Sequence, residues 1–184
     1  MKKLVLAAVA VAMTSTAAHA ADSDSKNFRI RANVQDECSV EDPDNVNFGN
    51  LAIDRAPGSE ALTLTTAFDN DFQDIWVSCN YAAEISLTTT NGGLVNQDAT
   101  NDGPDSADFT DVIEYNLSLR PSDGTAFQPV FLVTAQGVNT RSTAQTAAFH
   151  DQATLRTTIT QAFNPLRPLA GTYTDTATVS VGPV

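Results

Sequence analysis

The group of side chains best suited to chemistry is a run of aspartates between residues 96 and 111. Asp98, Asp102 and Asp105 follow one another at short spacing, and carboxylates spaced in this way on a loop are typical calcium ligands. If an EF-hand loop begins at Asp98, its twelfth position is Phe109, where calcium needs a bidentate Glu. Calcium binding by these three aspartates is therefore one hypothesis, and a solvated acidic loop is the alternative.

Catalytic machinery is not indicated by the sequence. A Ser-His-Asp triad needs a histidine base, and His150 is one of only two histidines. It lies in a Thr- and Ala-rich stretch that we interpret as a loop. No G-x-S-x-G turn is present, and no Gly-rich phosphate-binding motif precedes a helix. We predict that the protein is not an enzyme, has no catalytic residue and needs no cofactor.

The first twenty residues form a predicted signal peptide. Lys2 and Lys3 precede an apolar run over residues 4–13, and residues 18–20 read Ala-His-Ala, a small-x-small cleavage pattern. The run is too short for a transmembrane helix, which needs about 20 apolar residues. We predict export of a mature chain that begins at Ala21, without direct insertion into a membrane.

The two cysteines, Cys38 and Cys79, both follow the predicted cleavage site. In an oxidising compartment an even pair of cysteines usually forms a disulfide; two buried free thiols are the alternative. A bond between residues 41 positions apart would stabilise the fold by about 4 kcal/mol through loop-closure entropy. Because no C-x-x-C motif is present, we expect a structural and not a redox role.

Length and charge restrict the class of protein further. The chain has 184 residues, of which 42% are apolar, enough for one domain with a buried core. Its formal net charge is −12, and loss of Lys2 and Lys3 with the signal peptide makes it −14. A charge of this sign argues against nucleic acid as a partner, because the phosphate backbone attracts cationic surfaces.

Apolar and polar residues alternate along most of the mature chain. Such alternation is typical of β-strands with one buried and one wet face, and the many threonines suit a pleated surface. Clusters of Gly, Pro, Asp and Asn separate the runs as turns. No amphipathic helix stands out, so we predict a single β-sandwich with strands near residues 28–34, 62–65, 75–79, 85–88, 113–119, 155–159 and 173–181.

Five sequence pieces, in this order, resemble one known family. They are Phe-Arg-Ile-Arg-Ala-Asn-Val at 28–34 with Cys-Ser-Val at 38–40, Val-Asn-Phe-Gly-Asn-Leu at 46–51, Ile-Trp-Val-Ser-Cys at 75–79, Ile-Glu-Tyr-Asn-Leu at 113–117, and the run from Gly171 to Val181. Together they resemble the spore coat protein U-type pilins, the subunits of archaic chaperone–usher pili.

The resemblance implies an all-β, immunoglobulin-like (pilin-type) β-sandwich that lacks its final strand. In such subunits a periplasmic chaperone fills the resulting groove first, and the N-terminal strand of the next subunit replaces it in the fibre. Pro183 departs from the expected large apolar chain end, and because proline cannot donate a ladder hydrogen bond, it should end the last strand.

The donor strand that the resemblance implies is the alternating run at residues 28–34. Phe28, Ile30, Ala32 and Val34 would face the groove of a neighbouring subunit. In the alternative interpretation the same run is the first strand of its own domain. We accordingly expect a signal peptide at 1–20, an N-terminal extension at 21–37 and a pilin-like β-sandwich domain at 38–184.

Two functions follow as hypotheses. The first is a structural pilus subunit that polymerises by donor-strand exchange and takes part in surface adhesion or biofilm formation. Its partners would be identical or related pilin subunits, a periplasmic chaperone and an outer-membrane usher, and it would pass through the periplasm to the cell surface. The second is a self-complete secreted β-sandwich that acts as a binding module or adhesin, with calcium as a possible ligand.

Overall fold

The computed structural model describes residues 24–65 and 69–183. The predicted signal peptide at residues 1–20 lies outside the described residues. Two units divide the chain: one ends at Val34, the other begins at Gln35, and each is described by itself. In the described ranges, no helix combines the length and the apolar character needed to cross a membrane.

The described part of the first unit, residues 24–34, has no regular secondary structure. The strand predicted near residues 28–34 is therefore absent from the structure of the single chain, in which these residues have no strand to pair with among those described. The large apolar side chains of this stretch are exposed: Phe28 to 83%, Ile30 to 79% and Val34 to 83%. Exposed apolar residues are common on protein surfaces when they occur singly. Here they recur at alternate positions along one short stretch, which is the pattern of one face of a strand.

The second unit is all-β. Its long strands coincide with the alternating runs of the sequence, in which Thr, Val and Ile suit a pleated backbone. The strands are β1 (Cys38–Val40), β2 (Asp69–Cys79), β3 (Glu84–Thr89), β4 (Leu94–Asn96), β5 (Phe109–Thr110), β6 (Val112–Ile113), β7 (Tyr115–Pro121), β8 (Val130–Val133), β9 (Thr140–Ala144), β10 (Phe149–Ile159), β11 (Arg167–Pro168), β12 (Tyr173–Thr174) and β13 (Ala177–Gly182), with short 3₁₀ helices at Thr134–Gln136 and Gln161–Phe163.

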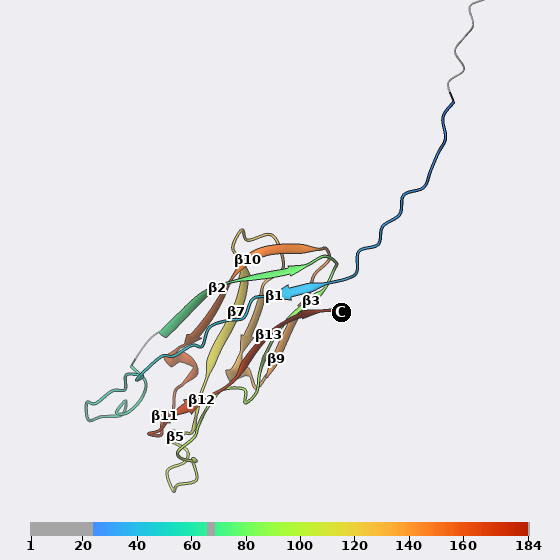
Figure 1. Cartoon of the computed structure of the whole chain (residues 1–184). Helices are drawn as coiled ribbons and strands as arrows, with labels where there is room; N and C mark the ends of the chain where they lie inside the picture. The colour runs from blue at the N-terminus through green and yellow to red at the C-terminus, as the bar shows by residue number, and fades with distance from the viewer. Residues whose placement is uncertain (1–23, 66–68, 184) are drawn as a thin grey trace, which may run out of the picture. The chain divides into compact units, whose positions relative to one another are not determined.

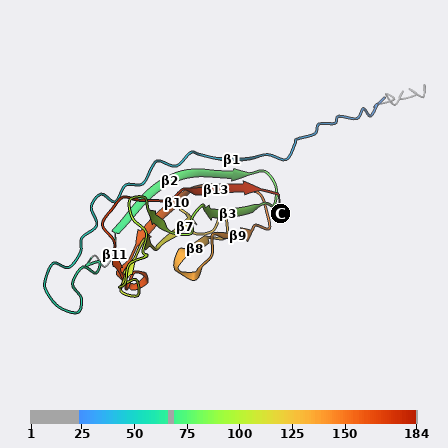
Figure 2. The same cartoon turned by 90° about the horizontal axis from the view of Figure 1, so that it is seen from below.

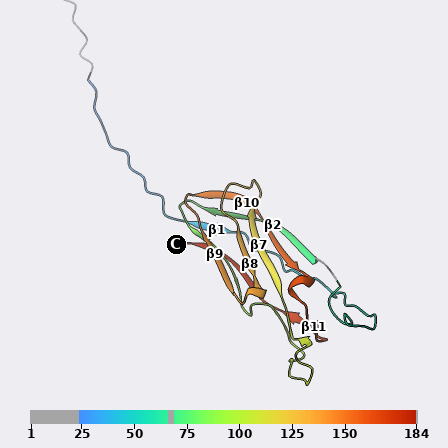
Figure 3. The ribbon, with the colours of Figure 1, turned by 180° about the vertical axis from the view of Figure 1, so that it is seen from behind.

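Two antiparallel sheets form the layers of a sandwich (Figure 1). One sheet has the strand order β1-β2-β10-β7-β8, and the other has the order β13-β3-β9. Two smaller sheets, β12-β4-β6 and the parallel pair β11-β5, extend one end. Figure 3 shows β10, β7 and β8 of the larger sheet side by side, with β9 of the other sheet next to β8. The predicted all-β sandwich is confirmed.

The core lies between the two main sheets. Along β3 the burial alternates, and Ile85 and Leu87 point inward and are completely buried. They belong to the same apolar cluster as Ile75 and Val77 of β2. Alternation along each strand therefore places one face in the core and the other in solvent, as the sequence predicts.

A disulfide joins the first strand of the domain to the second. Cys38 and Cys79 lie directly opposite each other in the β1–β2 ladder, and their sulfurs are bonded. The predicted disulfide is therefore present. Near this end, β1 lies close to β13 of the other sheet, so the linked pair stands at the boundary between the two layers.

The predicted strand at residues 62–65 is wrong. Leu62 has φ of 66°, a left-handed conformation that does not continue a strand. Hydrogen bonds from the Leu62 N–H to the Asp54 carbonyl and from the Thr63 N–H to the Glu60 carbonyl fold this stretch into turns. An isolated bridge between Ile53 and Leu64 is present, with hydrogen bonds from the Asp54 N–H to the Thr63 carbonyl and from the Thr65 N–H to the Ala52 carbonyl.

Candidate functional site

The candidate site is a groove beside β13, at the edge of the smaller main sheet. Within the described residues, the one strand that pairs with β13 is β3, so the other edge of β13 is open. Figure 2 shows β13 alongside β2 of the opposite layer. Between β13 and the chain that follows β1 lies a cavity of about 840 Å³, which we call the groove.

The floor of the groove is apolar and comes from the core itself. Tyr115, Leu117 and Leu155 of the larger sheet line it together with Leu87 of the smaller sheet, and each is at most 7% exposed. Val179 of β13 also lines the groove but is only half-buried. In the smaller sheet, the inward-facing side chains of β3 are therefore fully buried, whereas Val179 of β13 is only partly buried. Partial burial of this kind is expected of an edge strand without a neighbour.

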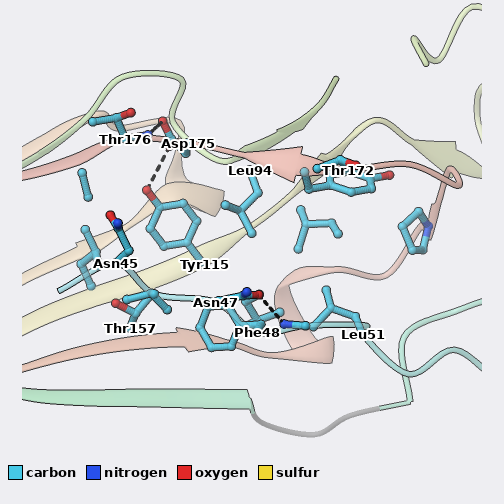
Figure 4. A pocket seen from close by; sticks show the side chains of 18 of the residues that line it. Asn45, Asn47, Phe48, Leu51, Leu94, Tyr115, Thr157, Thr172, Asp175 and Thr176 are labelled. Atoms are coloured by element: carbon cyan, nitrogen blue, oxygen red, sulfur yellow. Dashed lines mark hydrogen bonds between the residues drawn. The ribbon is translucent and has the colours of Figure 1, made fainter. Parts of the chain in front are cut away.

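Residues 43–51 border the groove opposite β13. Phe48 and Leu51 are half-buried and pack against the core, and both are labelled in Figure 4. Asp44 and the Gln73 side chain exchange two hydrogen bonds, of 2.8 and 2.9 Å. Within the described part of the chain, residues 45–51 make no backbone–backbone hydrogen bond, although the Gly49 N–H donates to the Asn47 side chain. The other backbone groups of this stretch, like the open edge of β13, have no backbone partner there.

One hydrogen bond ties the two layers together across the groove. The Tyr115 hydroxyl on β7 donates to Asp175, which precedes β13, at 2.9 Å (Figure 4). Asp175 also accepts from the backbone N–H of Asn91 and of Gly93. Burial, followed by the negative charge of Asp175, raises the pKa of Tyr115 well above its usual value. The hydroxyl therefore stays protonated and remains a donor.

The lip of the groove depends on a close approach between Asn96 and Gly171. Asn96 is buried; its amide N–H groups donate to the carbonyls of Leu169 and Ala170, and its oxygen accepts from the Asp98 N–H. Gly171 has φ of 152°, and a Cβ atom at this position would overlap the Asn96 amide. Only glycine fits here without strain.

Comparison with known proteins assigns this architecture to a family. The Spore Coat Protein U domain matches residues 24–180. The chain belongs to this family. No curated protein and no solved structure matches the chain.

Spore Coat Protein U domains form a family of fimbrial, pilus-type subunits, which are structural proteins that assemble with one another and are exported to the cell surface. The resemblance drawn from the five sequence pieces is thereby confirmed. The match includes the exposed stretch at residues 28–34 as well as the sandwich.

The calcium candidates of this Spore Coat Protein U domain are not brought together as a site. Asp98 accepts a hydrogen bond from the Thr172 N–H at 2.7 Å, whereas Asp102 and Asp105 are exposed on the loop. In the ranges that the structure describes, no group of three or more His, Cys, Asp or Glu side chains could hold a metal ion. The loop is instead closed by Asn101, whose amide donates to the Ser106 and Phe109 carbonyls.

His150 is a strand residue and not a loop residue, so this part of the sequence interpretation is wrong. It is the second residue of β10, where it lies opposite Ser78 of β2. Its Nδ1 atom is 2.6 Å from the Ser78 hydroxyl, and its ring stacks on Trp76 with centroids 4.8 Å apart. These contacts lie on the solvent-facing side of the sheet.

Sequence reasoning missed Asp175 and Asn96, the two polar residues that shape the groove. Asp175 interrupts the last alternating run, and an aspartate in a strand pattern is usually solvated. Its partner Tyr115 lies 60 residues earlier, so no local pattern connects them. The conspicuous glycine pair before Leu94 was the available signal, because Gly93 donates to the same carboxylate.

Proposed function

We propose that this protein is a pilus subunit whose groove accepts the N-terminal strand of another subunit. The observation that carries the proposal is the open edge of β13 beside an apolar groove in a disulfide-linked sandwich. A strand placed there would pair with β13 and with residues 45–51 and would cover the half-buried Val179. This is β-augmentation, in which backbone hydrogen bonds give affinity and alternate side chains fill pockets.

The donor in this proposal is the stretch at residues 28–34 of a second copy. Phe28, Ile30, Ala32 and Val34 occupy alternate positions, so all four would face the groove while Arg29, Arg31 and Asn33 stay in solvent. Exposure of 83%, 79% and 83% at the three large side chains leaves nearly all of their surface available for burial. Each would contribute about 1.5–3 kcal/mol.

In this proposal the two parts of the chain have different roles in assembly. Residues 21–37 act as the donor-bearing extension, and residues 38–184 act as the acceptor domain. Before assembly the groove is an unpaired sheet edge next to the half-buried Val179, and an unpaired edge promotes aggregation. A periplasmic chaperone that lends a strand would protect it, and an outer-membrane usher would exchange that strand for the donor of the next subunit. The resulting fibre would serve surface adhesion or biofilm formation.

Gel electrophoresis without boiling tests the proposal. We expect mature protein from the periplasm to run as a ladder, because subunits joined by a donated strand resist mild denaturant. Ile30→Asp places a charge in the groove of the acceptor and should abolish the ladder. The sandwich of the variant should keep its fold, since Ile30 lies in the exposed extension.

A matched control separates position from charge. Asn33→Asp introduces the same side chain three residues later, at a position that faces away from the groove in the proposed pairing. It should leave the ladder unchanged. A normal ladder from Ile30→Asp would overturn the donor assignment, and a single stable monomer band from the wild-type chain would contradict polymerisation itself.

A further inference from the structure

The outer face of the larger sheet carries an unusual set of side chains. Phe72 is 61% exposed, Trp76 46% and Phe131 46%. Phe72 and Phe131 share one row across four strands, because β10 and β7 place Arg156 and Ser118 between them in register. Directly opposed residues of neighbouring antiparallel strands project from the same face, so both rings are on one surface.

Each of these three rings is paired with a basic group. The guanidinium carbon of Arg120 lies 4.7 Å from the centroid of the Phe131 ring, and that of Arg156 lies 5.2 Å from the Phe72 ring. Trp76 stacks on His150. Such cation–π contacts hold the flat guanidinium groups over the sheet. Arg156 also donates through Nε and Nη2 to the side-chain oxygen of Asn70. Among the described residues, this leaves the N–H groups of Arg120 and the Nη1 group of Arg156 available to a partner.

The two arginines have no acidic partner of their own. Among the described residues, ion pairs within 4.0 Å are formed by Lys26 and Arg167 but not by Arg120 or Arg156. The one carboxylate in the neighbouring row of this face, Asp74, accepts a hydrogen bond from Thr154 at 3.0 Å. The Glu41 carboxylate, which accepts from the Trp76 N–H, lies at the far edge of the sheet. In a chain of net charge −12, Arg120 and Arg156 are thus two cationic groups without a carboxylate partner within 4.0 Å among the described residues.

The complementary surface is the acidic loop between β4 and β5. It projects at the end of the sandwich that carries β5 and β11 (Figure 1), and residues 97–108 contain four aspartates but no Lys or Arg. Asp98 is engaged by the Thr172 N–H, and Asp108 pairs with Arg167 at 3.7 Å. Asp102 and Asp105 remain exposed and can reach a partner molecule.

We propose that this aromatic–arginine face binds the acidic loop of a second copy of the chain, as a lateral contact between subunits that are not joined by a donated strand. Arg120 and Arg156 would pair with Asp102 and Asp105, and the three rings would cover the contact from the sheet side. The proposal goes beyond donor-strand polymerisation, because it uses neither the groove nor residues 28–34. Charge complementarity of this kind fixes partner and register.

Sedimentation of the full mature chain at low and high salt tests the lateral contact. We expect self-association at low salt and its loss at 1 M salt, where the Debye length is about 3 Å. Reversing either side, with Arg120→Glu/Arg156→Glu or with Asp102→Arg/Asp105→Arg, should weaken the association about five- to thirtyfold. A mixture of the two reversed variants should recover it, because the reversed face then meets the reversed loop.

Controls distinguish position, folding and the donor mechanism. Arg55→Glu/Arg141→Glu changes the net charge by the same amount at other exposed sites and should behave as the wild-type chain. The substitutions Asp102→Arg/Asp105→Arg lie in the acidic loop and not on the sheet. Folding of this variant therefore does not depend on the contacts of the three rings. The ladder on an unboiled denaturing gel reports donor-strand assembly separately and should be unchanged in every variant.

Three results would overturn the proposal: equal loss of association in the control variant, no recovery in the mixture, or normal association of both reversed variants. Retention on immobilised polygalacturonate that Arg120→Glu/Arg156→Glu abolishes, with self-association intact, would assign the face to an anionic polysaccharide instead. A missing ladder in the wild-type chain would contradict the donor-strand proposal alone.

Discussion

The seam between the two layers of the sandwich is closed at one end and open at the other. At the closed end, β1 pairs with β2, Cys38 is bonded to Cys79, and β13 lies close by. At the open end, residues 45–51 have no backbone partner in the described structure, and the seam widens into the groove. Residues 38–51 therefore join the two layers at one end of the sandwich. At the other end they leave the edge of β13 unpaired.

This difference separates stability from assembly. The closed end holds the layers through covalent and ladder bonds that need no partner. The open end leaves the edge of β13 and residues 45–51 without a backbone partner among the described residues, and an added strand could pair with both. Substitutions at the closed end should therefore change the free energy of unfolding of the single subunit, whereas substitutions at the open end should also change how subunits join.

The largest effect on stability is expected at the disulfide. Cys38→Ser/Cys79→Ser should lower the free energy of unfolding by up to about 4 kcal/mol, because the 41-residue loop is then unconstrained in the unfolded chain. Urea unfolding of the Ile30→Asp chain, in which we expect polymerisation to be blocked, measures this change through Trp76 fluorescence. An unchanged midpoint would show that the closed end does not depend on the covalent link.

The next effect is expected where Tyr115 crosses the groove. Tyr115→Phe removes the 2.9 Å hydrogen bond to Asp175 while keeping the ring, and should cost about 1.5–3 kcal/mol, the range for a hydrogen bond to a charged group. The same urea titration measures it. Because the bond joins the floor of the groove to the residue before β13, the variant should also give a weaker ladder. This combination would be absent if Tyr115 served packing alone.

A smaller effect is expected at the lip of the groove. Gly171→Ala forces a Cβ atom against the Asn96 amide at a position where φ is 152°. The substitution should lower the free energy of unfolding by about 1–3 kcal/mol. Gly103→Ala is the matched control, because nothing lies within 4 Å of a Cβ atom there. Equal thermal midpoints for the two variants would mean that the lip is free to rearrange.

The smallest effect is a pH dependence. The unfolded chain ionises tyrosine near pH 10, whereas burial and Asp175 raise the pKa of Tyr115 in the folded state. Its contribution to stability is therefore fully present below pH 10 and is lost as the pH rises further, by at most about 1.4 kcal/mol per pH unit. Urea titrations at pH 8 and pH 11 should show a smaller loss for Tyr115→Phe than for the wild-type chain.

The strands of the core could be predicted from sequence because their burial follows a strict alternation. Ile75 and Val77 in β2, and Ile85 and Leu87 in β3, are apolar at every second position and buried in the structure. Alternation does not predict a strand correctly where contacts with other parts of the chain determine the backbone conformation. Residues 62–65 alternate in the same way, yet hydrogen bonds to Asp54 and Glu60 turn them out of the sheet, and β9 escaped notice because most of its residues are exposed.

The groove itself was predictable only through the family resemblance. Alternation indicates that β13 has an inner face, but it does not tell whether a strand lies on both sides of it. The Tyr115–Asp175 bond and the Asn96–Gly171 contact join residues at least 60 positions apart, so local sequence patterns carry no sign of them. The acidic loop was conspicuous in the sequence, but its aspartates do not form one site. Asp98 accepts from a backbone N–H, Asp108 forms an ion pair, and the other two are exposed to solvent.

Photocrosslinking distinguishes donation of residues 28–34 to a neighbouring subunit from insertion of the same residues into their own sandwich. A photoreactive side chain in place of Ile30 is incorporated into the mature chain, and equal amounts of ¹⁴N- and ¹⁵N-labelled protein are mixed before assembly. Mass spectrometry then identifies the residues joined to position 30. Donor-strand exchange should give mixed-label crosslinks to groove residues such as Leu117, Leu155 and Val179. Crosslinks to these residues within one label only would show that the extension completes its own sandwich and would rule out donation to a neighbour.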